Sequence, residues 1–468
     1  MLHDDVLLEI FDIYVNKNEL QSYKKEIEKW QTLVHVCRRW RSVVFGSPRR
    51  LDLQLVCTSV TPARDTLDVW PSLPLVILDS DLTEDAEDDE ILAALERSDR
   101  VVEIQLYGVN GPNLETVLAA MQVPFPELTD LLLRSTDGKA SVLPDSFLGG
   151  SAPRLQFLTL ARIPFPGLSK LLLSTTHLID LHLDNIPHSG YISPEAIVAV
   201  LSTMTSLESL SLRFISPLSR PDWANRRLPP TTRSVLPVLT CFRFKGACEY
   251  LEDLMVHIDI PPLNRLYITL FNQIVFDTPQ FTQFVRLSPN LGPFEKAHVV
   301  FGSNATWVHL SSQTSVNGKL VMKIPCIELD WQVSSMEQVC TSCLPPLSPL
   351  EDLYISEYIY LPPVWQDNIE NTLWLELLRP FTGVKNLYLS EEFGSLIIPA
   401  LEELTGRRTT EVLPILQNIF LEKLQSSGTV QAGVHFISTR QDASHPIAVS
   451  RWDNLKDDMR ETYRQLHH

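Results

Sequence analysis

Two cysteines separated by two residues, Cys340 and Cys343, have the spacing most suggestive of chemistry in this sequence. Thiolates at this spacing can ligate zinc or exchange with a disulfide, but a structural zinc site requires four ligands. The sequence contains no second pair at zinc spacing. We therefore interpret Cys340 and Cys343 as two semi-buried thiols.

An acidic run, residues 84–90, offers carboxylates of the kind that bind calcium. It lacks the alternating ligands and the central glycine of a calcium-binding loop. Because carboxylates favour the positive end of a helix dipole, the run predicts the solvated start of a helix. The sequence has no glycine-rich phosphate loop, Gly-x-Ser-x-Gly or His-Glu-x-x-His motif, and its twelve histidines are scattered. We expect no catalytic residue, no cofactor and no metal, so the chain itself is not predicted to be an enzyme.

The composition indicates a folded protein that does not bind nucleic acid. Hydrophobic residues make up 44% and charged residues 21% of the chain, and its net charge of −18 opposes a phosphate backbone. Residues 1–50 hold nine Lys and Arg against seven Asp and Glu, so residues 51–468 carry −20. The seven cysteines form no even framework, and we see no apolar leader or membrane-length span. We expect an intracellular protein, cytoplasmic or nuclear, with no membrane partner.

A repeated apolar triad, Leu-x-x-Leu-x-Leu, dominates residues 51 to about 440. Adjacent copies start 23 to 34 residues apart, which brackets and slightly exceeds the period of leucine-rich repeats. The copies begin at Leu128, Leu155, Leu178, Leu207, Leu239, Leu263, Leu350, Val384 and Leu416, with weaker ones near Val101 and Ile324. The pattern resembles a leucine-rich-repeat solenoid, in which each repeat buries the leucines of one strand. The alternative is a set of ordinary buried strands in another α/β domain.

Several segments between the triads are predicted to form helices. Ser193, Pro194 and Glu195 supply an N-cap, a proline at the first helical position and an acidic first turn. Residues 113–121 and 366–379 carry one apolar face each, and Pro380 ends the second. The array is expected to be irregular, because isoleucines occupy the usual asparagine positions and residues 270–323 barely match the triad. We expect that segment to bulge from the array.

The strand residues that alternate with the leucines should face the concave surface and bind a target protein. They are rich in aromatic residues and arginine, which carry most interface energy. These predicted target-binding residues are Phe157, His182, Arg213, Phe214, Arg243, Lys245, Tyr267, Tyr354 and Tyr388. Arg213, Arg243 and Lys245 suggest a basic pocket for an acidic or phosphorylated segment. The alternative is that they are solvated charges paired with nearby carboxylates.

Residues 1–50 predict two amphipathic helices that pack together. Val6, Leu7, Ile10, Phe11 and Tyr14 form an apolar stripe in the first helix, and the second is expected from about 30 to 45. So small a core is marginal by itself and should need the following domain or a partner protein.

The run from Leu2 to Phe11 resembles the opening of an F-box, and the run from Val34 to Arg41 resembles its closing helix. In that family the apolar positions dock onto the Skp adaptor of a Skp–cullin–F-box ubiquitin ligase. By position, the resemblance implies these adaptor-binding residues: Leu2, Val6, Leu7, Ile10, Phe11, Leu33, Val36, Cys37 and Trp40. His3 stands where the family usually has proline, and the segment from 16 to 29 is longer and more charged than usual. The whole chain resembles the large fungal family of F-box proteins with degenerate leucine-rich repeats.

The expected architecture is an α/β repeat with three parts. Residues 1–50 form an F-box-like helical module, residues 51–440 an irregular leucine-rich-repeat solenoid, and residues 441–468 a C-terminal cap or tail. The implied function is substrate recognition for the ligase, in which the adaptor links the chain to a cullin scaffold and the repeats hold an unknown target. Alternatives are a non-ligase scaffold whose head caps the array, and an enzyme with its site in residues 270–323.

Overall fold

The computed structural model describes residues 2–16, 29–59, 67–79, 89–136, 142–165, 168–221, 233–271, 276–312, 320–366, 369–404, 408, 410–422, 436–438, 440–441 and 446–452. The chain divides into two compact units: unit 1, Met1–Ile192 with Thr203–Leu207, and unit 2, Ser193–Ser202 with Glu208–His468. Among the described residues, six strands of unit 1 and ten strands of unit 2 lie in mostly parallel sheet structure. The protein is therefore mixed α/β, as predicted. The expected boundary at residue 50 falls inside unit 1.

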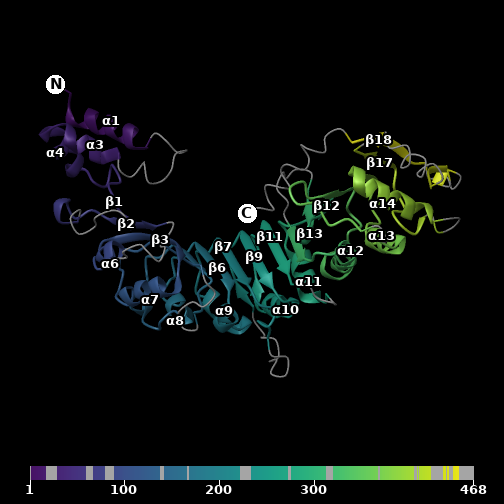
Figure 1. The fold of residues 1–468 in the computed structure, drawn as a ribbon, viewed down its shortest axis with the longest axis horizontal. Coiled ribbons are helices and arrows are strands. Elements are labelled where there is room, and N and C mark those ends of the chain that lie inside the picture. Colours follow the sequence, from purple (N-terminus) through teal and green to yellow (C-terminus); the bar gives the residue numbers. More distant parts are fainter. Residues whose placement is uncertain are drawn as a thin grey trace. The chain divides into compact units, whose positions relative to one another are not determined.

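In its described residues, unit 1 begins with a head that contains the helices α1 (Asp4–Asn16), α3 (Lys29–Val36) and α4 (Arg38–Gly46) (Figure 1). Its core holds Phe11 and Val34, and the Phe11 ring lies 4.8 Å from that of Trp40. Trp30 joins the head to the residues that follow, because its indole lies 5.2 Å from Trp70 and donates a 3.0 Å hydrogen bond to the carbonyl of Gln54. The following chain thus completes the burial of this small head.

The single second helix predicted for the head is wrong, because the structure places two helices there. Cys37 has extended backbone angles between α3 and α4, and its sulfur accepts a 3.5 Å hydrogen bond from the amide of Trp40. A helix cannot continue through an extended residue, so Cys37 acts as the N-cap of α4. The charged spacer, apart from its ends, lies outside the described residues.

The strands of unit 1 pair in sequence order and are all parallel. Helices α6, α7 and α8 lie along one side of them in Figure 1. The strands are β1 (Leu55–Cys57), β2 (Leu75–Asp79), β3 (Val101–Val109), β4 (Asp130–Ser135), β5 (Phe157–Ala161) and β6 (Asp180–Ile186). The helical segments between them are α6 (Asp89–Leu95), α7 (Gly111–Ala120), η1 (Phe147–Gly150) and α8 (Leu168–Leu172), and η2 (His188–Gly190) follows β6.

The main sheet of unit 2 is parallel except at its centre, where β13 runs antiparallel to β14 and β12. The strand order is β7-β9-β11-β14-β13-β12-β15-β16-β17-β18. The bounds are β7 (Ser209–Phe214), β9 (Cys241–Gly246), β11 (Arg265–Leu270), β12 (Lys296–Phe301), β13 (Ala305–Ser311), β14 (Leu320–Pro325), β15 (Asp352–Glu357), β16 (Asn386–Leu389), β17 (Asn418–Leu421) and β18 (Ala448–Arg451). A separate pair joins β8 (Ser234–Val235) to β10 (Ile258–Asp259).

Helix α9 precedes β7, and the other helices of unit 2 lie between its strands in the sequence; α10, α11 and α12 lie along one side of the strands in Figure 1. They are α9 (Pro194–Leu201), α10 (Cys248–His257), α11 (Pro279–Leu287), α12 (Leu329–Gln338), α13 (Asn371–Leu378) and α14 (Glu391–Glu402), and η4 (Val339–Cys343) is a π-turn after α12. Within the described part of the chain, no helix has both the length and the apolar character needed to cross a membrane.

The leucine triads supply the core beneath the helices. Leu131, Leu158, Leu181 and their register partners are fully buried, because one side of each strand faces the helices. Each such leucine contributes about 1.5–3 kcal/mol through burial. The predicted cap of α9 is confirmed, since the hydroxyl of Ser193 accepts a 3.3 Å hydrogen bond from the amide of Ala196.

The prediction that residues 270–323 bulge from the array is wrong. Strands β12, β13 and the start of β14 come from this segment and lie in the middle of the sheet of unit 2. Their burial is nearly continuous along the sequence, which hides the alternation on which the triad pattern depends. The weak triad predicted near Ile324 is also wrong, because its last position, Leu329, begins α12 and is not part of a strand.

Candidate protein-interaction surfaces

Helix α1 has two apolar stripes on different faces. Leu7 and Phe11 are buried within the head, whereas Val6 and Ile10 are exposed one turn apart. Ile13 and Tyr14 extend the exposed stripe by another turn. A helix in a self-sufficient domain buries one stripe only, so this second stripe is available to another surface.

The loop between α3 and α4 lies next to the start of this exposed stripe. Arg39 donates hydrogen bonds to the carbonyl of Leu2 and, at 2.7 Å, to the carboxylate of Asp4, so the start of α4 is held against the start of α1. Val36 and Cys37 are exposed beside Arg39.

The nine predicted adaptor-binding residues therefore separate into two groups. Leu2, Val6, Ile10, Val36 and Cys37 are exposed, and Trp40 is half-buried against Phe11. Leu7, Phe11 and Leu33 are buried in the head, where they pack the helices together. These three residues cannot contact a partner while the head stays folded. We therefore correct the predicted docking surface by removing them from it.

The strand face of unit 1, on the side opposite the leucines, carries a row of carboxylates. Glu103, Asp130 and Asp180 are in one register row, and Phe157 stands between the last two. Burial and, to a smaller extent, the negative charge of Asp130 together raise the pKa of Glu103 to about 7. Burial likewise raises the pKa of Asp130 to about 6, with Asp180 adding to the effect. Glu103 and Asp130 therefore lose their protons at about pH 6 to 7 rather than near pH 4. The predicted residue His182 lies two positions along from Asp180, and like Phe157 it faces this side.

The corresponding face of unit 2 carries a second hydrophobic core. Trp307, Tyr358 and Trp452 are buried in it together with Val300, Ala305 and Val321. The predicted residues Tyr354 and Tyr388 stack with ring centroids 4.2 Å apart, and both pack against the indole of Trp452. Tyr267 is packed against the same cluster. These three tyrosine side chains therefore pack against the second hydrophobic core, whether or not they also contact a partner.

Two histidines lie at the centre of this second core. His298 on β12 and His309 on β13 are register partners, and burial lowers the pKa of each to about 3. The Nε2 of His298 lies 3.3 Å from the hydroxyl of Ser356. Among the described residues, neither ring nitrogen of His309 has a hydrogen-bond partner. Both side chains are therefore neutral at physiological pH.

One predicted target-binding residue faces the wrong side. Phe214 is buried against Phe244 and Tyr250, with its ring 4.8 Å from that of Tyr250 on α10. Adjacent residues of a strand point to opposite faces, so Arg213 and Phe214 cannot both face the same side. We correct Phe214 to a core residue beneath the helices.

The remaining predicted residues, Arg213, Arg243 and Lys245, lie together at one edge of the second core. Lys245 is the register partner of Arg213, and Arg243 lies two residues earlier on the strand of Lys245. The guanidinium of Arg243 lies 5.4 Å from the centre of the Tyr267 ring. The pattern analysis missed Lys323 on β14, which joins this group through Thr269. Its strand lacks the leucine triad from which the other positions were chosen, so the sequence offered no comparable signal for it.

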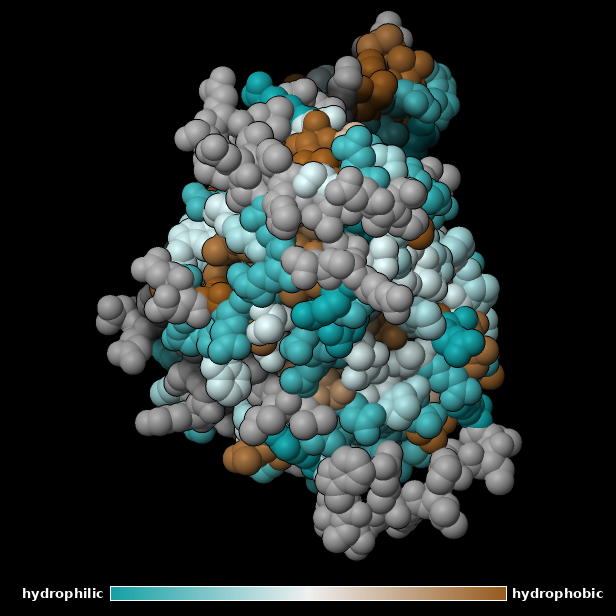
Figure 2. Space-filling model, turned by 90° about the vertical axis from the view of Figure 1, so that its right-hand side faces the viewer, coloured by the Kyte–Doolittle hydropathy of each residue, from teal (hydrophilic) through white to brown (hydrophobic). Residues whose placement is uncertain are grey.

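An exposed aromatic group, also missed from sequence, lies near the carboxyl ends of β14 and β15. A parallel bridge between Glu328 and Val364 brings residues 327–331 beside residues 359–365. The exposed residues there are Ile327, Trp331, Ile359, Tyr360, Leu361, Val364 and Trp365. Such residues are frequent in protein interfaces. The face shown in Figure 2 is mainly hydrophilic, with hydrophobic residues in separate groups.

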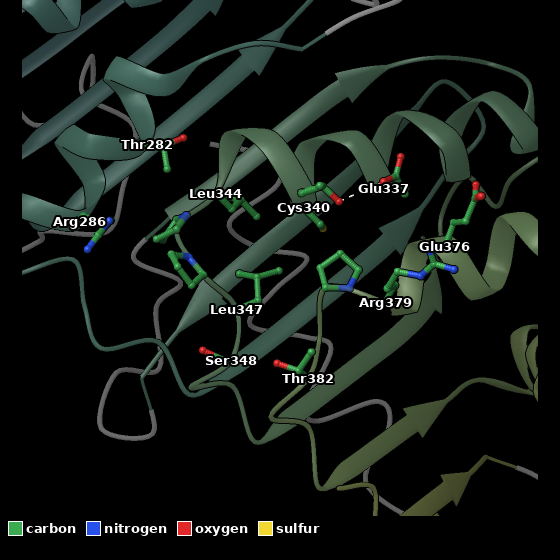
Figure 3. Close-up of a pocket in the computed structure, with 14 residues that line it drawn as sticks. Thr282, Arg286, Glu337, Cys340, Leu344, Leu347, Ser348, Glu376, Arg379 and Thr382 are labelled. Carbon is green, nitrogen blue, oxygen red and sulfur yellow. Dashed lines mark hydrogen bonds between the residues drawn. The ribbon is translucent and has the colours of Figure 1, made fainter. Parts of the chain in front are cut away.

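A cavity of about 820 Å³ lies on the helical side of unit 2 (Figure 3). Arg286 of α11, Glu337 of α12 and Arg379 after α13 are among the residues that line it (Figure 3). The hydrogen bond drawn there, 3.0 Å between the Thr341 hydroxyl and Glu337, joins two residues one helical turn apart. The cavity thus combines charged rims with an apolar floor.

The thiols near this cavity do not offer a nucleophile or a metal site. Cys340 and Cys343 are both buried, and burial raises the pKa of each thiol. Reactive cysteines require a lowered pKa and access to solvent. In the described ranges, no group of three or more His, Cys, Asp or Glu could hold a metal ion. Of the acidic run, Asp89 and Glu90 form the first turn of α6, and residues 84–88 lie outside the described residues.

No protein-family model matches the chain, and no curated protein matches it. The features of the chain that bear on its function are therefore the exposed apolar stripe of α1 and the strand faces of the two units.

Proposed function

We propose that this chain is the substrate-recognition subunit of a Skp–cullin–F-box ubiquitin ligase. The exposed stripe of the head binds the Skp adaptor, which connects the chain to the cullin scaffold. The strand faces of the two units hold the target protein. The ligase partners supply the chemistry, and this chain raises the effective concentration of the target near them.

The single observation that carries the proposal is the second apolar stripe of α1. Val6, Ile10, Ile13 and Tyr14 are exposed, whereas Leu7, Phe11 and Val34 are buried in the head. The same stripe contains positions at which the F-box resemblance implies adaptor contact. Exposure of several large apolar side chains in a row costs solubility, and an adaptor would remove them from water.

The test is a pull-down of the full chain with a purified Skp adaptor. Ile10→Asp should abolish capture, because it places a charge in the apolar contact. It should leave the free energy of unfolding within about 0.5 kcal/mol, because the side chain is exposed. Val123→Asp is the matched control, since Ile10 and Val123 are each 46% exposed and Val123 lies outside the head. Leu7→Asp is unsuitable, because Leu7 is buried and the head would unfold.

A second candidate is a scaffold in which the head only caps the strand array. The packing of Trp30 on Trp70 and its hydrogen bond to Gln54 favour this role, since they cover the residues next to β1. Failure of the unaltered chain to bind the adaptor would support the scaffold. Capture by the unaltered chain and by Val123→Asp, with loss in Ile10→Asp, would support the ligase subunit.

A further inference from the structure

The exposed aromatic group near the start of α12 is large for the surface of a single chain. We call it the tryptophan patch and define it by six residues: Ile327, Trp331, Tyr360, Leu361, Val364 and Trp365. These residues are between 39% and 69% exposed. Half of a large side chain presents on the order of 100 Å² to water. The patch therefore matches or exceeds the largest apolar patch of a typical monomer, about 300–600 Å², and such patches mark interaction sites.

A buried glutamine fixes the position of the two segments that carry the patch. Gln332 of α12 is fully buried, and its Nε2 donates hydrogen bonds to the carbonyls of Gly302 at 2.7 Å and Ile327 at 3.2 Å. The amide of Ser303, next to Gly302, donates a 2.9 Å hydrogen bond to the carbonyl of Leu361. The turn at Gly302 therefore connects both segments of the patch.

A second set of contacts joins the segments at their other ends. Glu328 and Val364 form a parallel bridge. The side chain of Gln366 accepts a 3.1 Å hydrogen bond from the amide of Asp330 and donates one of 2.7 Å to the carboxylate of Glu328. A surface held in this way loses little conformational entropy when a partner binds. The patch is thus ordered before any partner arrives.

The charge along the chain around the patch has one sign. Residues 324–378 contain nine Asp and Glu and no Lys or Arg. Two of these carboxylates, Glu328 and Asp330, lie within the patch, and their hydrogen bonds come from uncharged donors: Gln366 at 2.7 Å and the amide of Trp331 at 2.8 Å. Like charges placed opposite each other across an interface cost affinity. A partner that covers the apolar side chains should therefore bring positive charge.

We infer that the tryptophan patch binds an amphipathic α-helix of a partner protein, with Lys or Arg residues beside the apolar face of that helix. Such a helix presents apolar side chains at positions i, i+3, i+4 and i+7, which can pack on exposed aromatic rings. An extended segment binds mainly through backbone hydrogen bonds at a strand edge, whereas this surface presents side chains. The carboxylates repel an anionic membrane or a nucleic acid.

The inference goes beyond the proposed function and does not rest on it. The patch belongs to unit 2, whereas the adaptor-binding stripe belongs to the head of unit 1. The helix that binds the patch is therefore a ligand additional to the adaptor.

The experiment measures binding of the full chain to three labelled helical peptides by fluorescence anisotropy. Each peptide is about 18 residues long, or five helical turns. The first has a leucine face flanked by lysines, and the second has glutamates in place of the lysines. The third has the composition of the first, with its leucines spread around the helix. The first should bind at least about tenfold more tightly than either of the others.

The three peptides separate the possible outcomes. Equal binding of the glutamate peptide would overturn the assigned charge of the partner. Equal binding of the third peptide would show attraction by net charge alone and overturn the inference. Absence of binding by the first peptide would overturn it as well.

A matched pair of substitutions locates the binding. Val364→Lys should weaken binding of the first peptide by about 100-fold, because it places a positive charge within the apolar contact. Val235→Lys is the control, because Val235 and Val364 are each 55% exposed and each lies in a short parallel pairing of unit 2. The control should stay within about twofold of the unaltered chain, and both variants should keep its urea midpoint. Equal losses of binding would place the peptide elsewhere and overturn the inference.

Two further variants test the apolar and the charged parts of the patch separately. Trp331→Ala should weaken binding about 30-fold, as expected for a tryptophan anchor of an interface. Glu328→Gln with Asp330→Asn should weaken binding about fivefold, because exposed ion pairs contribute little each. No change in Trp331→Ala would overturn the site, and no change in the double variant would overturn the assigned charge.

Two controls test other occupants of the patch. Sedimentation of the unaltered chain should show no dimer that Val364→Lys disperses, and such a dimer would assign the patch to a second copy of this chain. Skp adaptor capture by Val364→Lys should equal that of the unaltered chain. Loss of capture in this variant alone would assign the patch to the adaptor and overturn the inference. Failure of the unaltered chain to capture the adaptor would overturn the ligase function and keep the helix-binding site.

Discussion

In both units, leucines fill the face of the strands that packs against the helices. The opposite face of the strands differs between the two units. In unit 1 that face holds carboxylates, and Phe157 within the row is 37% exposed. In unit 2 it holds a second core in which Trp452 is only 4% exposed. The leucine pattern therefore determines one face of each strand, and the residues between the leucines determine whether the other face is polar or closed. This difference should appear in stability, in acid sensitivity and in sensitivity to base.

The largest expected effect comes from the second core. Trp452→Ala should lower the free energy of unfolding by about 3 kcal/mol, because it removes a buried indole from the stacked tyrosines. Phe157→Ala is the matched aromatic deletion in unit 1 and should cost less than about 1 kcal/mol. Urea denaturation followed by circular dichroism measures both. Equal losses would remove the distinction between an open and a closed face.

A smaller effect should appear when the pH falls. An unfolded histidine gains a proton below its usual pKa of about 6.5, whereas His309 in the folded protein does so only near pH 3. The unfolded state therefore binds more protons between these values, and unfolding becomes easier as the pH falls. For His309 alone the loss between pH 7 and pH 5 is about 2 kcal/mol.

His309→Leu should remove this loss and keep the stability at pH 7.5 within about 1 kcal/mol, because leucine has a similar volume and no unpaired ring nitrogen. Urea denaturation at pH 5 and pH 7.5 gives the comparison. An acid loss that is the same in the variant would mean that His309 does not stay neutral in the folded protein.

The smallest expected effect on the free energy of unfolding arises in unit 1. There, stability falls as the pH rises, which is opposite to the effect of His309. The pKa of Glu103 rises from the usual 4.5 to about 7 on folding, so the folded state binds more protons in that range. Stability therefore falls as the pH rises from about 4.5 to 7. Glu103→Gln should be more stable than the unaltered chain by about 1 kcal/mol at pH 8, allowing for solvent screening of a half-buried group, and equal to it at pH 4.

Glu115→Gln on α7 is the control for the loss of one negative charge. Glu115 is exposed on the helical side, so its replacement should change the stability by less than about 0.5 kcal/mol at either pH. A gain at pH 8 as large as that of Glu103→Gln would assign the effect to net charge rather than to the carboxylate row.

Sequence periodicity was sufficient for the core beneath the helices. Leu131, Leu158 and Leu181 are buried where the triads predict, because a strand places alternate residues on one face. The cap of α9 at Ser193 also follows from local chemistry, since a hydroxyl before a helix-starting proline accepts a backbone hydrogen bond.

The groups of side chains that form only when strands pair, such as the carboxylate row of unit 1, could not be predicted from the sequence. Glu103 and Asp130 are far apart in sequence and become neighbours only through the register of β3 and β4. Lys323 joins Lys245 through an intervening strand, and Trp452 reaches the tyrosines from the tail. The break at Cys37 was missed because its neighbours keep a helical apolar pattern on both sides.

Strands β12, β13 and β14 limit how the number of strands could change by deletion or duplication. Elsewhere in the two units a strand with its following helix could be lost or copied, and its neighbours would still run parallel. At the centre of unit 2, β14 pairs with β11 and β12 pairs with β15, so three strands fill the place of one. Loss of a single strand would reverse the chain direction and break a parallel pairing. Loss of two would leave one strand parallel to both neighbours. Length changes in this segment should therefore occur in hairpins, and those elsewhere in strand–helix units.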